Sequence, residues 1–145
     1  MVRAASSVHG IDVGRIEAAI EAAERRTSAE LRVAIARFYF WGDVRRAAAS
    51  TFRRLDMQRT RKRNAVLIFI APRRRRFAVI ADDGIPAHVS PAFWNDVASK
   101  LRTAFATSDA TGGLERAITA IGDTLSAPFP PESSNRNELP NQVVR

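Results

Sequence analysis

The stretch AVLIFIAPRRRRFAVIADDGI (residues 65–85) decides the fold of this chain. Residues 65–70 are apolar at every position, which is typical of a strand that is covered on both faces of a sheet. Pro72 and four arginines interrupt the apolar pattern, and residues 77–81 form a second apolar run. Because the link between the two runs is short, we predict that they pair as antiparallel strands.

Upstream of this stretch, residues 29–38 switch between apolar and other positions with a period of two, which predicts another strand. A helical pattern follows, and Asp43 is the predicted N-cap of that helix. Since strand, helix and strand form a right-handed crossover, the strand over residues 29–38 should run parallel to residues 65–70. An amphipathic helix over residues 11–25 precedes it.

Downstream, Ser90 and Pro91 give a strong start signal for a helix, with the serine as cap and the proline in the first turn. We expect Gly112 and Gly113 to break the chain, and the last helix to begin near Leu114. These elements predict a single α/β domain, a three-layer α/β/α sandwich with a small mixed sheet of three to four strands.

The ends of the chain differ in composition from the rest. Residues 127–145 hold four of the seven prolines and show no apolar periodicity. We therefore predict a flexible N-terminus over residues 1–10, the folded domain over residues 11–126 and a flexible Pro-rich tail over residues 127–145.

The chain is strongly basic, with 23 Lys and Arg residues against 15 Asp and Glu residues and a net charge of +8. Such a surface favours anionic partners, although the codon usage of a GC-rich genome would also produce it. The chain has no cysteine, which excludes disulfides and thiolate chemistry. The N-terminus lacks an apolar signal region, and the longest apolar run has seven residues against the roughly 20 of a spanning helix. We expect a monomeric cytoplasmic protein without a transmembrane segment, and membrane association stays open.

Basic residues gather at both ends of the buried strand. The first run, Arg59, Arg61, Lys62 and Arg63, precedes the strand, and the second run, residues 73–76, follows it. A strand of about eight residues at about 3.3 Å per residue separates the two runs by roughly 26 Å. The two runs therefore cannot form one continuous track for nucleic-acid phosphates. The second run is the candidate anion-binding tip, which we define as Arg73, Arg74, Arg75 and Arg76 together with Arg45 and Arg46 at the start of the preceding helix. The alternative is a solvated hairpin whose charges protect a strand edge.

Acidic and amide side chains are predicted to meet at the opposite end of the sheet. The candidate metal ligands of this acidic pole are Glu30, Asn64, Asp82 and Asp83. Oxygen ligands of this kind suit a hard cation such as Ca²⁺. The alternative is a plain turn in which Gly84 takes a positive φ and the nearby basic run neutralises the aspartates.

Two smaller features of the sequence also have two interpretations each. His88 follows the acidic pole and could form an acid–base pair with Asp82 or Asp83, but a plain surface histidine is the favoured interpretation. Trp41 lies in an aromatic cluster with Tyr39 and Phe40. We expect this cluster to cap the core, and the alternative is an exposed stacking or membrane-interface site.

The order of these elements resembles the TPM domain family. The resemblance is carried by EAAERRTSAELRVAIA (residues 21–36), where the family has a helix followed by T-S-x-E-[IL]-R-V, by residues 52–85, and by GGLERAITAIGDTL (residues 112–125). It implies an α/β/α sandwich. It also implies the roles linked to family members, which are acid phosphatase activity, calcium binding, and photosystem-repair or receptor-associated functions.

Individual positions match the family pattern unevenly. Glu30 stands at the family's strand-opening glutamate, and Asn64 matches the asparagine of the usual D-N-G. Arg63 replaces the aspartate of that motif, which puts a cation beside any metal. Asp82 and Asp83 occupy a turn that is commonly G-x-G in the family, where only Gly84 keeps its place.

Three functions follow from these observations. The leading one is a non-catalytic binding module that engages an anionic protein or membrane surface through the basic tip. The alternative is a divalent-cation-dependent phosphatase that uses Glu30, Asp82 and Asp83, with Ca²⁺ as the candidate cofactor. The third is nucleic-acid binding, which the division of positive charge between two poles disfavours.

Overall fold

The computed structural model describes residues 7–36, 41–132 and 143–144. The main elements are α1 (Val13–Glu24), β3 (Glu30–Ile35), α2 (Val44–Arg54), β4 (Ala65–Ala71), β5 (Arg76–Ala81), α3 (Pro91–Ala106) and α4 (Ala110–Leu125). The short ones are β1 (Ser7–Val8), β2 (Ile11–Asp12), the 3-10 turns η1 (Met57–Arg59) and η2 (Pro72–Arg74), and β6 (Val143–Val144). Across this part of the chain, no helix has both the length and the apolar character needed to cross a membrane.

The main sheet has the strand order β5-β4-β3-β6. β3 pairs parallel with β4, as the crossover rule predicts, and β4 pairs antiparallel with β5 through the short η2 connection. Both predicted strand directions are confirmed. β5 therefore stands at one end of the sheet with β4 on its inner side.

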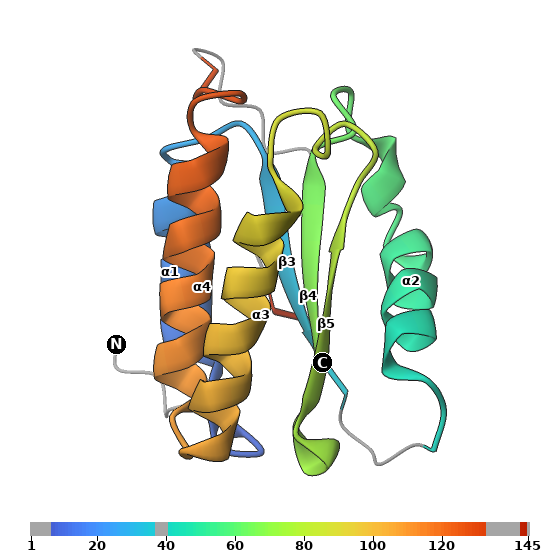
Figure 1. The fold of residues 1–145 in the computed structure, drawn as a ribbon, viewed down its shortest axis with the longest axis vertical. Coiled ribbons are helices and arrows are strands. Elements are labelled where there is room, and N and C mark those ends of the chain that lie inside the picture. The colour runs from blue at the N-terminus through green and yellow to red at the C-terminus, as the bar shows by residue number, and fades with distance from the viewer. Residues whose placement is uncertain (1–6, 37–40, 133–142, 145) are drawn as a thin grey trace.

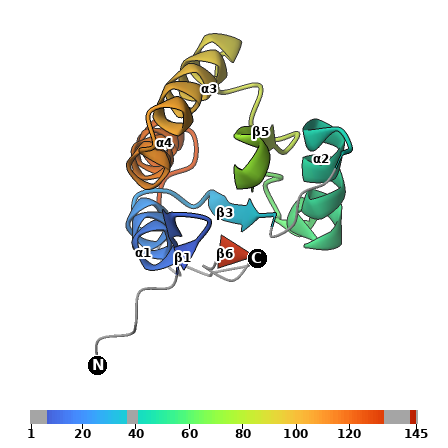
Figure 2. The same ribbon diagram turned by 90° about the horizontal axis from the view of Figure 1, so that it is seen from below.

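Helices cover both faces of this sheet, and the predicted three-layer α/β/α sandwich is confirmed. α1, α3 and α4 lie on one face, and α2 lies on the other (Figures 1 and 2). Side chains of β4 alternate between the two cores: Val66 and Ile68 pack toward the three helices, whereas Leu67 and Phe69 pack toward α2. β4 is buried along its whole length, which explains its continuous apolar sequence.

Two helix starts test the predicted caps. The Asp43 side chain accepts a hydrogen bond of 3.1 Å from the backbone N–H of Arg46, so the predicted N-cap of α2 is confirmed. α3 does begin at Pro91, but the side chain of Ser90 makes no capping hydrogen bond. The start of α3 thus depends on the φ of proline rather than on a serine cap.

The predicted break at Gly112 and Gly113 is wrong, because both glycines lie inside α4. The chain turns earlier, where Ser108 has a φ of +58°. A Cβ atom on Gly113 would lie 2.2 Å from the Cβ of Ala104 in α3. This glycine therefore permits a close approach of two helices rather than a turn, and only the tertiary packing distinguishes the two uses.

The close approach of α3 and α4 predicts an unusual response to a small substitution. Gly113→Ala should lower the free energy of unfolding by about 2 kcal/mol, because two packed backbones would have to separate. Removing the opposing methyl group in the double variant Ala104→Gly/Gly113→Ala should recover much of the loss. Urea titrations followed by circular dichroism measure both. Gly112→Ala is the control, because the Cβ there would meet only the end of the Asp109 side chain; equal losses in the two single variants would contradict this packing.

Parts of both chain ends belong to strands or to the core. Phe129 is buried, and its carbonyl accepts a 2.9 Å hydrogen bond from the N–H of Ser28. Val143 and Val144, which the composition assigns to a flexible tail, pair with β3 as the strand β6. Ser7–Val8 likewise pairs with Ile11–Asp12. The contacts of Phe129 and of β6 join segments that are about 100 or more positions apart in the sequence, which local periodicity cannot predict. Residues 133–142 lie outside the described part.

Candidate functional site

The acidic pole is built around an ion pair. Arg63 holds the carboxylate of Asp82 through two hydrogen bonds, from Nε to Oδ2 at 2.9 Å and from Nη2 to Oδ1 at 3.1 Å. Asp82 is buried, and its Oδ1 also accepts a bond of 2.8 Å from the N–H of Asp83. Hydrogen bonding and the negative charge of Asp82 raise the pKa of Arg63. The guanidinium thus occupies the face of the carboxylate that a cation would need.

Gly84 closes this turn, but not for the reason that its sequence suggested. Its φ lies outside the left-handed region, and Arg63 has the positive φ instead, at +51°. A Cβ on Gly84 would lie 2.1 Å from the carbonyl oxygen of Lys62. The Gly84 N–H donates to the carbonyl of Arg63 at 2.8 Å. Glycine is therefore required here by close contact between two backbones.

The other predicted ligands do not join Asp82. Glu30 and Asp82 both flank Ala65, so about two strand spacings, roughly 9–10 Å, separate their backbones. Asn64 is buried, and Asp83 is exposed at the surface. Among the residues that the structure describes, no three His, Cys, Asp or Glu side chains gather closely enough to hold a metal. Glu30 instead belongs to a different cluster.

That cluster is a buried charged group that the sequence reading missed. The Oε2 atom of Glu24 accepts a 3.1 Å hydrogen bond from the N–H of Leu31. Burial is the main reason that the pKa of Glu24 is raised to about 8. The hydrogen bond from Leu31 opposes this change, whereas the negative charge of Glu30 and a hydrogen bond with Glu30 support it. Burial also lowers the pKa of Arg32, whose side chain shares this site. Glu24 ends α1 and Glu30 begins β3, so the two residues flank the same turn. Their closeness in the sequence is the signal that could have predicted this cluster.

The positions of His88 and Trp41 bear on the two interpretations that the sequence left open for each of these residues. His88 is exposed, and its ring packs edge-on against Phe129 with centroids 5.3 Å apart. Trp41 is 88% exposed, so the prediction that it caps the core is wrong. Tyr39 and Phe40 lie outside the described residues. The exposed indole lies two residues before Asp43, the N-cap of α2.

Most of the predicted basic tip lines one open groove of about 780 Å³. The groove lies between the start of α2, the strand β5 and one face of α3. We define this basic groove by its lining residues, Asp43, Val44, Arg45, Arg74, Arg75, Arg76, Phe77, Ala78, Val79, Trp94, Asn95, Ala98 and Arg102. Five arginines therefore face a single carboxylate, that of Asp43, which already caps α2.

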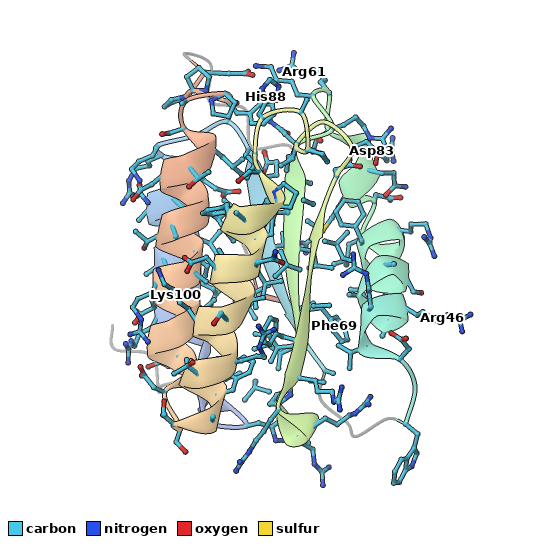
Figure 3. All side chains as sticks on the ribbon, in the orientation of Figure 1. Arg46, Arg61, Phe69, Asp83, His88 and Lys100 are labelled. Atoms are coloured by element: carbon cyan, nitrogen blue, oxygen red, sulfur yellow. The ribbon has the colours of Figure 1, made fainter. Side chains whose placement is uncertain are left out.

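The predicted residues divide around this groove. Arg45, Arg74, Arg75 and Arg76 line it, and the Nη1 of Arg74 donates to the carbonyl of Gly42 at 2.6 Å, which ties η2 to the segment before α2. Arg46 lines a separate hollow with Arg53, and it points away from the sheet in Figure 3. Arg73 lines none of the hollows described here.

Sequence reasoning missed Arg102, which α3 brings to the groove from 26 positions beyond Arg76. A local signal did exist. Trp94, Ala98 and Arg102 follow one another at intervals of four residues, so they lie on the same face of a helix. The strand pattern alone could not show that this face of α3 turns toward β5.

The basic run that precedes β4, Arg59, Arg61, Lys62 and Arg63, lies at the opposite end of this strand from the basic groove. β4 has seven residues, so its ends lie about 20 Å apart. Arg61, Asp83 and His88 gather at that far end (Figure 3), whereas η2 lies at the other (Figure 1). Arg61 and Lys62 pair with Glu132 at 3.2 and 3.1 Å. The two basic regions are thus separate, and part of the run before β4 is neutralised within the chain.

Comparisons with known proteins relate this chain to a sequence family and to solved structures. The sequence model of the TPM domain matches residues 5–124. Among solved structures, the NMR structure of the BA42 protein from the psychrophilic bacterium Bizionia argentinensis is similar, with a TM-score of 0.85 and 29% sequence identity over 99% of this chain and 97% of that one. A search of curated proteins found no match.

Proposed function

This chain belongs to the TPM domain family, and we propose that this member is a non-catalytic module that binds an anionic partner, a protein or a membrane surface, through the basic groove. One observation carries the proposal: Arg45, Arg102 and the three groove arginines of residues 74–76 converge on one hollow from three separate segments of the chain. Such a concentration of like charge costs folding energy, and an anionic ligand relieves that cost.

The chemistry of the groove suits carboxylates or phosphates. Each guanidinium presents planar, paired donors that match two oxygens of an anion. A cationic side chain near an anionic surface contributes about 1 kcal/mol to binding. Trp94 adds an apolar wall beside these charges, so a ligand with both acidic and apolar groups has contacts for each.

The acidic pole offers less support for the alternative, a cation-dependent phosphatase. The proposed ligand Asp82 is already neutralised by Arg63 at 2.9 Å, and Glu30 is buried beside Glu24 and Arg32. In this member, the ion pair between Arg63 and Asp82 takes the place that a metal would need. Nucleic-acid binding is also weakly supported, because the two basic regions do not join.

Salt dependence tests the proposal. Polyglutamate, and separately vesicles of phosphatidylserine and phosphatidylcholine, serve as acidic probes in titrations between about 50 and 300 mM salt. We expect affinity for at least one probe to fall by about tenfold over this range, because the Debye length shortens and exposed charges are screened. An affinity that salt does not change, or no binding even at low salt, would refute the proposed function.

A further inference from the structure

We propose that the basic groove binds an extended peptide segment with alternating acidic and apolar residues, which adds as a new strand along the free edge of β5. The inference rests on the proposed function and narrows its partner from any anionic surface to a protein segment in one conformation. Edge-strand addition of this kind supplies affinity through main-chain hydrogen bonds and specificity through alternate side chains.

The hydrogen-bonding phase of β5 identifies the backbone groups that face outward. The N–H of Asp82 donates to the carbonyl of Ala65 at 3.0 Å, so these two residues form a hydrogen-bonded pair. In an antiparallel ladder such pairs alternate with pairs that make no mutual bonds. The register of β4 and β5 then turns the N–H and C=O groups of Phe77 and Val79 away from β4. β4 is the only strand that pairs with β5 among the described residues.

The groove follows this free edge. Phe77, Ala78 and Val79 are consecutive in β5, and all three line the groove. Successive residues of a strand point to opposite faces of the sheet. A hollow that contacts each of them in turn must therefore run along the edge, where both faces are within reach. Figure 2 shows β5 at the end of the sheet, between α3 and α2.

The two walls of the groove favour different side chains in a bound peptide. Ala78 packs into the core under α2, so Arg76, two residues earlier, points to the same face, on which Arg45 lies. Phe77 and Val79 face the other side, toward Trp94. An added strand would therefore turn acidic side chains toward Arg45 and Arg76 and apolar ones toward Trp94. Arg102 adds positive charge on the α3 side.

A peptide fits this groove better than a lipid surface does. The acceptor is a strand edge recessed between two helices, and an extended chain can enter there and satisfy the main-chain groups of Phe77 and Val79. The arginines also explain why an exposed edge is compatible with a stable protein. Charged residues at an edge repel the same edge of another copy, while they attract a strand of opposite charge.

N-methylation of a probe peptide separates strand addition from simple charge attraction. The probe is an acetylated and amidated peptide of about seven residues that alternates Glu and Val, long enough to match β5. Two further versions carry N-methyl groups on the Glu residues alone or on the Val residues alone. All three have the same charge. Only one set of amides can face β5 in a paired strand, so we expect one methylated version to lose at least about tenfold in affinity and the other to bind like the parent.

Amide hydrogen exchange gives an independent measurement on the same complex. Binding of the parent peptide should slow exchange of the Phe77 and Val79 amides, and it should leave the already bonded Ala78 amide nearly unchanged. Equal binding of all three peptides, with no new protection at Phe77 and Val79, would overturn strand addition while the charge-based function stands. Salt-sensitive binding to anionic vesicles without any binding of the parent peptide would favour a membrane partner and overturn the inference. Failure of every acidic probe at low salt would refute the proposed function itself.

Discussion

Reversing the charges of Arg45 and Arg102 in the double variant Arg45→Glu/Arg102→Glu is expected to weaken binding of an acidic peptide by about 100-fold. The two residues line opposite walls of the basic groove, on α2 and α3. Each reversal removes one attraction, which contributes about 1 kcal/mol near an anionic surface, and adds a repulsion that solvent screens to less than this value. A loss of about 2.7 kcal/mol corresponds to the stated factor. Isothermal titration calorimetry at low salt measures it.

The same net change of charge elsewhere on the two helices provides the control. Arg46 follows Arg45 in α2 but lines a different hollow, and Lys100 lies on α3 in an exposed pair with Asp96. The double variant Arg46→Glu/Lys100→Glu should retain affinity within a fewfold of the unmodified protein. If both double variants lost affinity equally, the net charge of the molecule rather than the groove would determine binding.

A second large effect concerns pH. The free energy of unfolding should fall as the pH rises from about 4.5 to about 8. The Glu24 carboxyl has its folded-state pKa raised from 4.5 to about 8, chiefly because of burial. Below pH 4.5 this group is protonated in both states. Between the two values the unfolded chain releases the proton and the folded protein keeps it, so stability falls by up to 1.36 kcal/mol per pH unit. Above about pH 8 the loss from this group is complete.

Glu24→Gln should remove most of this dependence, because the amide stays neutral and its oxygen can still accept from the N–H of Leu31. At pH 8 we expect the variant to be more stable than the unmodified protein by about 2 kcal/mol or more. Urea denaturation at a series of pH values measures the difference. Glu21→Gln, an exposed substitution in the same helix, is the control and should not change the slope. Parallel pH profiles for Glu24→Gln and the unmodified protein would contradict a protonated Glu24.

The fold could be predicted largely because its decisive signals are local. The continuous apolar run of β4, the period of two in β3 and the short η2 link each depend on neighbouring residues, and together they determined layers and strand directions. Gly113 shows where this reasoning fails. A glycine pair that ends a helix and one that admits a neighbouring helix look alike until Ala104 of α3 is placed against it.

The candidate sites divide in the same way. The sequence indicated that basic and acidic residues would meet near Asp82, but not that Arg63 would bind this carboxylate with two hydrogen bonds. That geometry depends on the positive φ of Arg63 and on Gly84, which no periodicity encodes. Arg102 reached the basic groove through the packing of α3, far along the chain. Local patterns thus predicted where acidic and basic residues gather at the two ends of the sheet. The tertiary structure determines which residues form each site.

Amide chemical shifts of the labelled protein test the central claim, the use of the basic groove, most directly. The protein is titrated with the parent Glu–Val peptide and, in a separate sample, with calcium. We predict that the peptide shifts the resonances of Arg45, Phe77, Val79 and Arg102, and that calcium leaves Asp82 and Asp83 unchanged because Arg63 occupies the carboxylate. Localised calcium shifts at Asp82 and Asp83, with no peptide shifts along β5, would contradict the claim and place the functional site at the acidic pole.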